Sequence, residues 1–284
     1  PVVCVGNLVA GGAGKTPVVL ALVAALAARG AVHCLSRGYG GSSPGPRRVD
    51  AARDSAVEVG DEALLLARAA PSWVARDRTA GARAAAAAGA RVLVMDDGFQ
   101  NPALAKDLSL VVVDGAYGFG NRRGMPAGPL RESVARGLAR ADAVVLLGRD
   151  ELNLGAALAR RLPVLTAQLA PRPGSESLVG RKVLAFAGIG RPEKFFATLA
   201  GPEGGLGAEL VETRAFPDHH PYSAAELRSL RARARSLDAI LVTTEKDAVR
   251  LTPEQREGIE TLAVAVAWDD PAALQALLDK LPVP

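Results

Sequence analysis

The residues with the clearest chemical potential form a glycine-rich segment near the start of the chain, GNLVAGGAGKTP at residues 6–17. The segment follows a short apolar run and precedes a helical pattern, which is the context of a phosphate-binding loop. Glycines let several backbone N–H groups point at one anion, and the following helix adds the positive end of its dipole. Lys15 would reach the β and γ phosphates of a nucleotide, and Thr16 would offer its hydroxyl to Mg²⁺. The expected nucleotide-binding residues are Gly11, Gly12, Ala13, Gly14, Lys15, Thr16 and Pro17.

This loop departs from the strict pattern, because Val9 stands where a glycine is usual. Gly11, Gly12 and Gly14 still supply the permissive turn, so the anion-binding mechanism is unaffected. Partitioning and arsenite-pump ATPases carry a lysine where Ala10 stands, which argues against a dimeric switch of that kind. The simpler alternative is a glycine-rich turn beside a surface lysine, and the coincidence of strand, Gly-Lys-Thr and helix argues against it.

A second feature is the acidic end of the apolar run VLVMDDGFQ, residues 92–100. A strand that ends in carboxylates would bring them to the edge of the sheet beside the glycine-rich loop, where hard oxygen ligands suit Mg²⁺. Asp96 and Asp97 are adjacent, so on an extended strand they would point in opposite directions. We therefore expect one to meet the metal and the other to serve a second role. A pair of turn residues is the alternative.

Two segments offer groups for proton transfer. VGDEALLLAR starts a helical pattern at Asp61 and Glu62, where helix capping explains both carboxylates without any chemistry. FPDHHPY, residues 216–222, packs Asp218, His219 and His220 between two prolines. A histidine beside a carboxylate suits proton transfer near neutral pH, and a packing histidine in a loop is the alternative.

Several arginines follow strands in segments rich in glycine or proline. Arg37, Arg122, Arg123 and Arg131 are candidate anion contacts, because a guanidinium can bind phosphate through two parallel hydrogen bonds. Each could equally be a solvated surface charge. The segment TTEKDAVRL, residues 243–251, follows an apolar run and is either the start of a helix or part of the chemistry. The sequence leaves both interpretations open.

The elements that position these residues follow from the apolar pattern. Continuous apolar runs at 2–5, 32–35, 91–97, 109–114 and 143–148 predict strands buried on both faces, as in a parallel sheet. Helical patterns lie between them at 15–29, 61–70, 79–89 and 132–141. Later segments predict strands at 182–190, 208–216, 240–244 and 261–268, and helices at 192–200, 223–236 and 271–281.

The alternation of strands and helices predicts an α/β fold, a mostly parallel sheet like that of P-loop NTPases with helices on both faces, plus a second smaller α/β lobe. The Pro/Gly/Ser-rich stretch at 170–180 separates a core lobe at 1–170 from a C-terminal lobe at 178–284. The final helix could pack back on the core. We expect a cleft between the lobes.

The composition of the 284 residues limits the class of protein. Hydrophobic content is 49% and charged content 23%, as in ordinary globular proteins. The net charge of +4 is spread along the chain, which suits an anionic substrate or membrane face and gives no sign of nucleic-acid binding. Cys4 and Cys34 lie in apolar runs and are predicted to be reduced core residues. No apolar stretch reaches the roughly 18 residues of a spanning helix.

The ordered motifs resemble one family, the tetraacyldisaccharide 4'-kinases of lipid A biosynthesis. The family's stretches occur here in order as VGNLVAGGAGKTP, LSRGYGG, VGDEALLL, DDGFQ, PAGPLRE, FPDHHPY and TTEKDAVRL, spanning residues 5–251. The displaced glycine of the first loop is also a feature of this family. The resemblance implies ATP- and Mg²⁺-dependent phosphorylation of the 4'-hydroxyl of an acylated disaccharide 1-phosphate, giving lipid IVA.

The resemblance also implies roles for individual residues. It makes Asp61 a base rather than a helix cap, with His219 as its orienter and Asp97 as a further catalytic residue. The residues implied near the metal are Thr16, Asp96, Gln100 and Glu132, and those implied for substrate or anion contact are Arg37, Arg123 and Arg131.

We further expect a monomer that acts at the cytoplasmic face of the bacterial inner membrane and meets that membrane's surface. The family usually begins with an apolar membrane-associated segment, and we expect that anchor to be missing from this chain. The alternative function is a P-loop GTPase or ATPase switch, or a metallochaperone-like nucleotide-binding module. Guanine recognition usually needs an Asn/Thr-Lys-x-Asp segment, and TTEKDAV does not fit that spacing.

Overall fold

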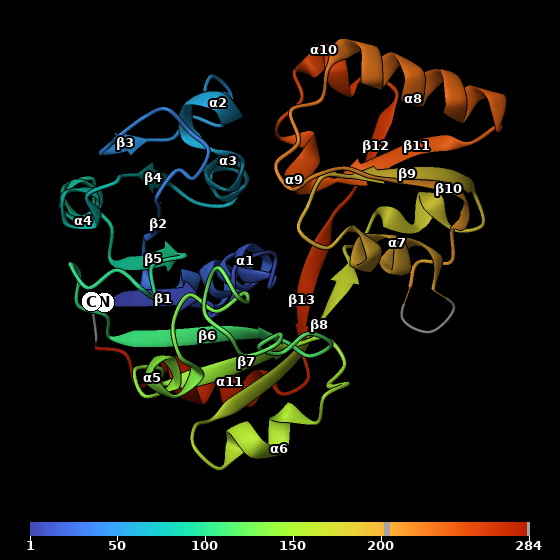
Figure 1. Cartoon of the computed structure of the whole chain (residues 1–284). Helices are drawn as coiled ribbons and strands as arrows, with labels where there is room; N and C mark the ends of the chain where they lie inside the picture. Colours follow the sequence, from blue (N-terminus) through green and yellow to red (C-terminus); the bar gives the residue numbers. More distant parts are fainter. Residues whose placement is uncertain (202–204, 283–284) are drawn as a thin grey trace. The chain divides into compact units, whose positions relative to one another are not determined.

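In the computed structural model, which describes residues 1–201 and 205–282, the apolar runs form a nine-stranded sheet (Figure 1). Its strands are β1 (Val2–Gly6), β2 (Val32–Ser36), β3 (Arg47–Arg48), β4 (Ser72–Val74), β5 (Val92–Asp96), β6 (Leu108–Asp114), β7 (Ala143–Leu147), β8 (Val164–Pro171) and β13 (Val264–Trp268). The strand order is β13-β8-β7-β6-β1-β5-β2-β4-β3. Strands β1, β2 and β4–β8 pair in parallel, and β3 pairs antiparallel to β4 at one edge.

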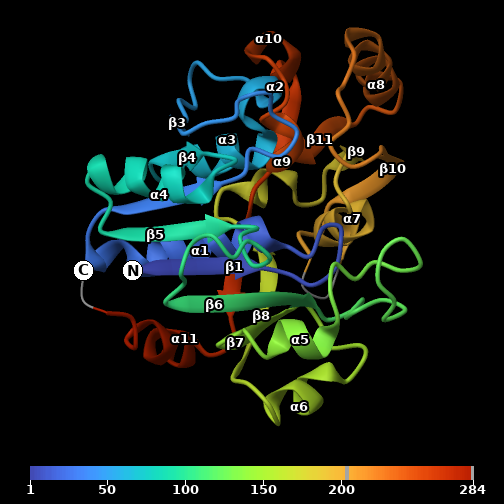
Figure 2. The ribbon, with the colours of Figure 1, turned by 60° about the vertical axis from the view of Figure 1, so that its left-hand side comes forward.

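Residues of this sheet alternate between two apolar cores, one on each face. Val3 and Val5 of β1 belong to a core that includes side chains of α1 (Lys15–Leu26) and α11 (Pro271–Leu278). Cys4 belongs to a core that includes side chains of α4 (Arg78–Ala87), α5 (Val134–Leu138) and α6 (Leu154–Ala159). The helices can be followed in Figures 1 and 2. Because both faces are covered, the central strands are buried and mostly apolar, as their sequences predict.

Short connections and helices join the strands. The helices are α1 (Lys15–Leu26), η1 (Ala27–Arg29), α2 (Ala56–Val59), α3 (Asp61–Ala67), α4 (Arg78–Ala87), α5 (Val134–Leu138), α6 (Leu154–Ala159), η2 (Ser175–Leu178), α7 (Pro192–Ala200), α8 (Ala224–Ser236), α9 (Glu245–Ala248), α10 (Pro253–Arg256) and α11 (Pro271–Leu278). In the part of the chain that the structure describes, no helix combines the length and the apolar character needed to span a bilayer.

A second sheet has four strands in the order β10-β9-β11-β12, all paired in parallel. Its strands are β9 (Lys182–Ala187), β10 (Glu209–Ala215), β11 (Ile240–Thr244) and β12 (Ile259–Leu262). Helix α7 contributes Phe195 and Leu199 to the core on one face, and α8 contributes Leu227 and Leu230 to the core on the other.

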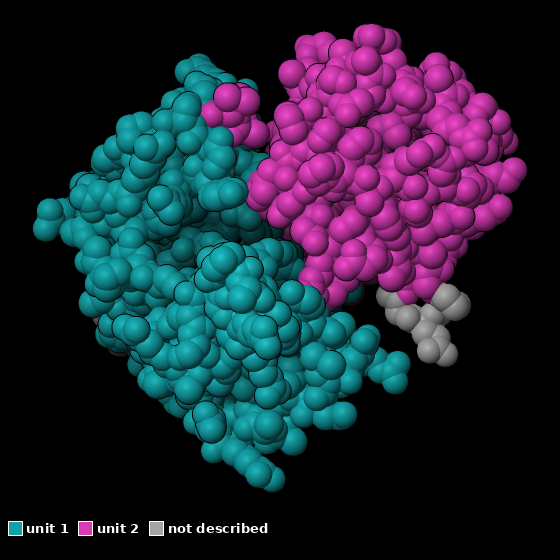
Figure 3. Space-filling view, viewed as in Figure 1, with its two compact units in different colours: residues 1–54, 58–169, 266–284 teal, residues 55–57, 170–265 magenta. Residues whose placement is uncertain are grey.

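The chain divides into two compact units, coloured in Figure 3. Unit 1 comprises residues 1–54, 58–169 and 266–284, and unit 2 comprises residues 55–57 and 170–265. These limits differ from the expected lobes of 1–170 and 178–284, because residues 266–284 belong to unit 1. Leu274, Leu277 and Leu278 of α11 lie in a core of the nine-stranded sheet, so the last helix is part of that unit.

The segment 261–268, predicted as one strand, is two. Strand β12 ends at Leu262 and joins the second sheet, while β13 begins at Val264 and joins the first. The carbonyl of Ala263, the residue between them, accepts the N–H of Arg172, so its hydrogen bond goes to the segment that follows β8. The sequence offers no glycine or proline at this break, and the prediction of a single strand is wrong for that reason.

Candidate active site

The glycine-rich loop joins β1 to α1. Gly14 precedes the helix in the left-handed conformation, with a φ of 82°, and Gly11 has a φ of 105°. A Cβ at Gly14 would also collide with the Leu147 side chain. The positive φ and the lack of space therefore both favour glycine at this position. Gly14 carries no side chain that could cap the helix, which leaves an anion as a suitable partner for the first N–H groups of α1.

Lys15 and Thr16 face the two carboxylates at the end of β5. The hydroxyl of Thr16 donates to Oδ2 of Asp96 over 3.2 Å, and Nζ of Lys15 lies 3.7 Å from Oδ1 of Asp97. Strands β1 and β5 are neighbours, with Val5 beside Asp96, which is why the loop and the acidic strand end meet. The structure therefore brings together the two strongest features of the sequence.

The two carboxylates have different environments. Asp97 has a φ of 52°, so the chain leaves the strand direction there, and its Oδ1 accepts a hydrogen bond of 2.8 Å from Arg131. Asp96 is 1% exposed, and its Oδ1 has no hydrogen-bond partner in the described part of the chain. Burial, reinforced by the charge of Glu62, raises the pKa of Asp96 to about 7, and the nearby Lys15 opposes this shift. A buried carboxylate oxygen without a partner is suited to a cation.

The segment PAGPLRE runs beside the glycine-rich loop. The N–H of Ala10 donates to the carbonyl of Pro129 over 2.8 Å, and the N–H of Arg131 donates to the carbonyl of Leu8 over 2.9 Å. Val9 forms an isolated β-bridge with Leu130. Val9 is 4% exposed and packs in the core, which explains an apolar residue where other loops carry glycine.

Gln100 and Glu132 form one hydrogen-bonded group with Arg140. Gln100 donates to the carbonyl of Asn7 over 2.9 Å and to Oε1 of Glu132 over 3.1 Å. Arg140 donates to both carboxylate oxygens of Glu132, at 2.7 and 2.8 Å, and these hydrogen bonds lower the pKa of Glu132. Glu132 is thus ionised and oriented, but its oxygens already have protein donors. A metal ion bound by Glu132 would share these oxygens with the donors of Gln100 and Arg140.

Asp61 is the first residue of α3. Gly60, with a φ of 86°, occupies the N-cap position, so Asp61 stands inside the helix rather than at its cap. The side chain is buried, with 4% exposed, and its Oδ1 accepts the N–H of Glu62 over 2.8 Å. A Cβ at Gly60 would press on the carbonyl of Tyr39, so the segments LSRGYGG and VGDEALLL pack closely against each other.

His219 and His220 belong to unit 2 and have different surroundings. The ring of His220 stacks on Phe216, with centroids 4.7 Å apart, and one ring nitrogen lies 3.0 Å from Glu226. His219 has a φ of 60°, and its Nε2 lies 3.4 Å from Nζ of Lys246 and 3.7 Å from Oδ1 of Asp218. The ring of His220 is therefore held by Phe216 and Glu226, whereas the ring of His219 lies near the two charged groups of Lys246 and Asp218.

Some residues of this region escaped the sequence analysis. Arg78, the first residue of α4, is 3% exposed, and its pKa is lowered by burial and by the charge of Arg37. An arginine in the first turn of a helix opposes the helix dipole, and this was the available signal. Asn7 is fully buried, and its Oδ1 has no partner among the described residues. Of the predicted anion contacts, Arg37 and Arg123 are exposed.

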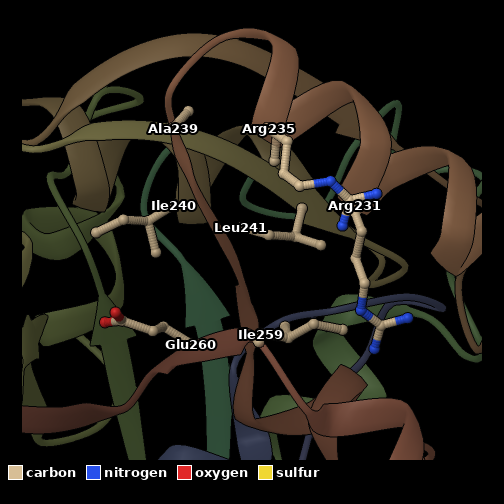
Figure 4. Close-up of a pocket in the computed structure, with 9 residues that line it drawn as sticks. Arg231, Arg235, Ala239, Ile240, Leu241, Ile259 and Glu260 are labelled. Carbon is tan, nitrogen blue, oxygen red and sulfur yellow. The ribbon is translucent and has the colours of Figure 1, made fainter.

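Other features of the surface do not coincide with these residues. A pocket of about 420 Å³ lies at the amino ends of β11 and β12 beside α8 (Figure 4). It is lined by Arg231, Ala234, Arg235, Ala239, Ile240, Leu241, Gly258, Ile259 and Glu260. None of the predicted site residues is among them. Arg231 of α8 donates hydrogen bonds to the carbonyls of Gln255 and Glu257, so its guanidinium joins α8 to the segment before β12 within unit 2.

Comparison with known proteins identifies the chemistry that this arrangement serves. The chain matches the family model described as LpxK, tetraacyldisaccharide-1-P 4'-kinase, over residues 1–282. The chain belongs to this family. A tetraacyldisaccharide 4'-kinase from Rhodospirillum centenum is 62% identical over 99% of the chain and 83% of that relative. One from Rhodospirillum rubrum is 58% identical over 99% of the chain and 85% of the relative.

A solved structure of the family has the same fold. It is a crystal structure of LpxK from Aquifex aeolicus in complex with ATP, with a TM-score of 0.75 and 28% identity over 99% of the chain and 88% of that structure's chain. The predictions of this family, of an α/β fold with a large mostly parallel sheet, and of a phosphotransferase are confirmed. The alternative of a nucleotide switch or metallochaperone-like module is set aside.

Proposed function

We propose that this chain transfers the γ-phosphoryl group of ATP to the 4'-hydroxyl of a tetraacyldisaccharide 1-phosphate, giving lipid IVA, at the cytoplasmic face of the inner membrane. The observation that carries the proposal is the meeting of Lys15 and Thr16 with Asp97 and Asp96 at one edge of the nine-stranded sheet. Phosphoryl transfer depends mainly on alignment and charge stabilisation, and this edge offers the groups for both.

The glycine-rich loop and Lys15 would bind the phosphates of ATP. Asp97 pairs with both Arg131 and Lys15, so two positively charged side chains share one carboxylate and bring positive charge to the N-terminus of α1. That charge suits the polyphosphate chain of a nucleotide. The ATP bound by the Aquifex aeolicus relative supports ATP as the donor here.

The residues at Thr16 and Asp96 fit a magnesium ion. The unpartnered Oδ1 of Asp96 and the hydroxyl of Thr16 are hard oxygen donors in one place. Among the described residues, no group of three or more His, Cys, Asp and Glu side chains could hold a metal. Mg²⁺ suits such a sparse set, because it keeps several waters and takes few carboxylates; when bound it would neutralise phosphate charge. Gln100 and Glu132 would orient its surroundings.

Asp61 is proposed as the base that receives the proton of the acceptor hydroxyl, and His219 as the group that orients it. Asp61 is a buried carboxylate at the first residue of α3, and the ring of His219 lies near Lys246 and Asp218.

Arg37, Arg123 and Arg131 are proposed as contacts for anionic groups of substrate or nucleotide. We further propose that the protein acts as a monomer at a membrane surface, where its lipid acceptor resides.

Transfer to a purified acceptor tests this function. The chain is incubated with labelled ATP, Mg²⁺ and tetraacyldisaccharide 1-phosphate in detergent micelles, and the lipids are separated by thin-layer chromatography. We expect label to move from ATP into a lipid only when the acceptor is present. Release of free phosphate at an equal rate with and without the acceptor, and no labelled lipid, would refute the proposal and favour a nucleotide hydrolase.

A further inference from the structure

The segment TTEKDAVRL, whose role the sequence did not decide, is hydrogen-bonded to Gly188 in the turn after β9 of unit 2. Asp247, the third residue of α9, is fully buried. Its Oδ1 accepts hydrogen bonds from the N–H of Gly188 at 2.9 Å, the hydroxyl of Tyr222 at 2.7 Å and Arg250 at 2.9 Å. Its Oδ2 accepts the hydroxyl of Thr244 at 2.6 Å. A buried carboxylate with four donors is a rigid anchor.

Gly188 connects this anchor to the backbone of His219 through a hydrogen bond. The carbonyl of Gly188 accepts the N–H of His219 at 3.0 Å and a second hydrogen bond from Arg250 at 3.0 Å. A Cβ at Gly188 would lie 2.9 Å from the Tyr222 hydroxyl and 3.0 Å from Cβ of His220, so the turn is closely packed as well as hydrogen-bonded. The backbone of His219 is therefore fixed by Asp247 through Gly188.

His219 occupies an unfavourable backbone conformation. Its φ of 60° lies in the left-handed region, which is sterically unfavourable for a residue with a side chain. Such a conformation persists where the surroundings determine it, and Asp247, Gly188 and Arg250 supply those constraints. The result is a histidine whose ring has a defined place close to Lys246.

The contact between Lys246 and the ring determines which nitrogen carries the proton. Nζ of Lys246 lies 3.4 Å from Nε2 of His219. An ammonium group has donors and no acceptor, so this contact is a hydrogen bond only when Nε2 is unprotonated and Nδ1 carries the proton. Oδ1 of Asp218 is 3.7 Å from Nε2, beyond hydrogen-bond distance, and already accepts the backbone N–H of His219 at 3.1 Å.

We propose that Lys246 is a positioning residue for the phosphoryl transfer, which fixes the Nδ1–H tautomer of His219. The proposal rests on the role proposed for His219. While Nε2 accepts from Lys246, Nδ1–H is the donor that the ring retains for orienting a carboxylate, and free imidazole side chains mostly carry the proton on Nε2. Lys246 thus supplies a preference that the histidine lacks by itself.

Nuclear magnetic resonance of the imidazole nitrogens tests the proposal without measuring activity. The chain is labelled with ¹⁵N-histidine and has 3 histidines, and His219→Gln assigns the relevant signals. Above the usual histidine titration range we expect Nδ1 of His219 to be protonated in the wild type. Lys246→Met should move the proton to Nε2, and Lys246→Arg, which retains a cationic donor, should restore Nδ1–H at least in part.

Asp218→Asn and Lys182→Met are matched controls. Asp218 lies 3.7 Å from both Nε2 of His219 and Nζ of Lys246, so Asp218→Asn removes a charge near the ring and keeps the lysine, and Lys182 is an exposed lysine at the amino end of β9. Neither change should alter the tautomer. A wild-type ring protonated on Nε2, an unchanged spectrum in Lys246→Met, or a switch caused by Asp218→Asn would each overturn the proposal.

Turnover separates this proposal from the proposed function. Lys246→Met should lower kcat about tenfold with the KM for ATP nearly unchanged, because ATP binding involves unit 1 residues. If His219→Gln keeps full kinase activity, the role of His219 in the proposed function fails, whereas the tautomer measurement still decides what Lys246 does. If His219→Gln is impaired and Lys246→Met is not, the positioning role fails alone.

Discussion

Adjacent carboxylates with opposite environments are the main feature of the site at the scale of single residues. Asp97 pairs with Lys15 and Arg131, whereas Asp96 is buried beside Thr16 with one oxygen unpartnered. A pair of titratable groups whose environments differ in this way is typical of sites that divide two tasks between two similar side chains. Asp96 suits a cation, and Asp97 sets the place of the two basic side chains.

Replacing Asp96 by asparagine should stabilise the protein in the absence of nucleotide and metal while abolishing activity. The pKa of Asp96 is raised from 3.8 to about 7, so ionisation favours the unfolded chain. The stability gained by Asp96→Asn should be absent near pH 3.8, grow as the pH rises toward 7, and stay constant above. Thermal unfolding across this range measures it. Asp269→Asn, at an exposed carboxylate, is the control, and an Asp96→Asn protein less stable than the wild type at pH 8 contradicts the argument.

Replacing Arg131 by methionine should weaken ATP binding. Without this guanidinium, Asp97 keeps Lys15 as its neighbouring cation, so the carboxylate competes with phosphate for the lysine. We expect the KM for ATP to rise by about tenfold, the effect of losing one charge-assisted hydrogen bond. Arg131→Lys should recover part of the affinity, and Arg160→Met, at the exposed arginine that follows α6, should leave it unchanged. Equal KM values for the Arg131→Met variant and the wild type would count against this role.

At the scale of elements, the loop between β1 and α1 depends on glycine at one position in particular. Gly14→Ala should destabilise the loop, because alanine at a φ of 82° is strained and its Cβ would collide with Leu147. The free energy of unfolding should fall by about 1 kcal/mol or more, with loss of ATP binding. Gly89→Ala has a similar φ of 92° and open space around its Cβ, so it measures the strain alone. Urea unfolding and ATP titration distinguish the two, and equal effects would contradict the steric argument.

Strands that are buried on both faces could be predicted from the sequence. Strands in which exposed polar residues alternate with buried ones could not. Strands β1, β2, β5, β6 and β7 are mostly apolar and almost entirely buried, and their predicted limits agree with the structure to within one residue. Strand β8 was missed because Thr166 and Gln168 are exposed and interrupt the apolar run. The break at Ala263 was missed because the chain changes sheet there without a residue that ends strands.

The limits of prediction in the site have the same physical origin. The glycine-rich loop and the acidic strand end could be predicted because local sequence determines them. Asp61 has the same local pattern as a helix cap, so only the resemblance to a family gave it a role. The pairs of Glu132 with Arg140 and of His219 with Lys246 depend on tertiary contacts, and no spacing along the chain predicts them.

At the scale of the whole molecule, the proposed chemistry draws on both compact units. The nucleotide residues and Asp61 belong to unit 1, and His219 belongs to unit 2 together with Lys246 and Asp247. The proposed function gives Asp61 and His219 a shared task, the activation of one acceptor hydroxyl. Residues that act as one catalytic group have strongly non-additive effects on turnover, which makes the claim measurable.

The most direct measurement is a double-mutant cycle on kcat with Asp61→Ala and His219→Ala, using saturating ATP and purified disaccharide 1-phosphate. We expect Asp61→Ala to lower kcat by about 10²–10⁴-fold, the usual contribution of acid–base catalysis, and the double variant to be little worse than Asp61→Ala alone. Correctly folded Asp61→Ala protein that phosphorylates the acceptor at the wild-type rate, or two effects that multiply in the double variant, would contradict the account.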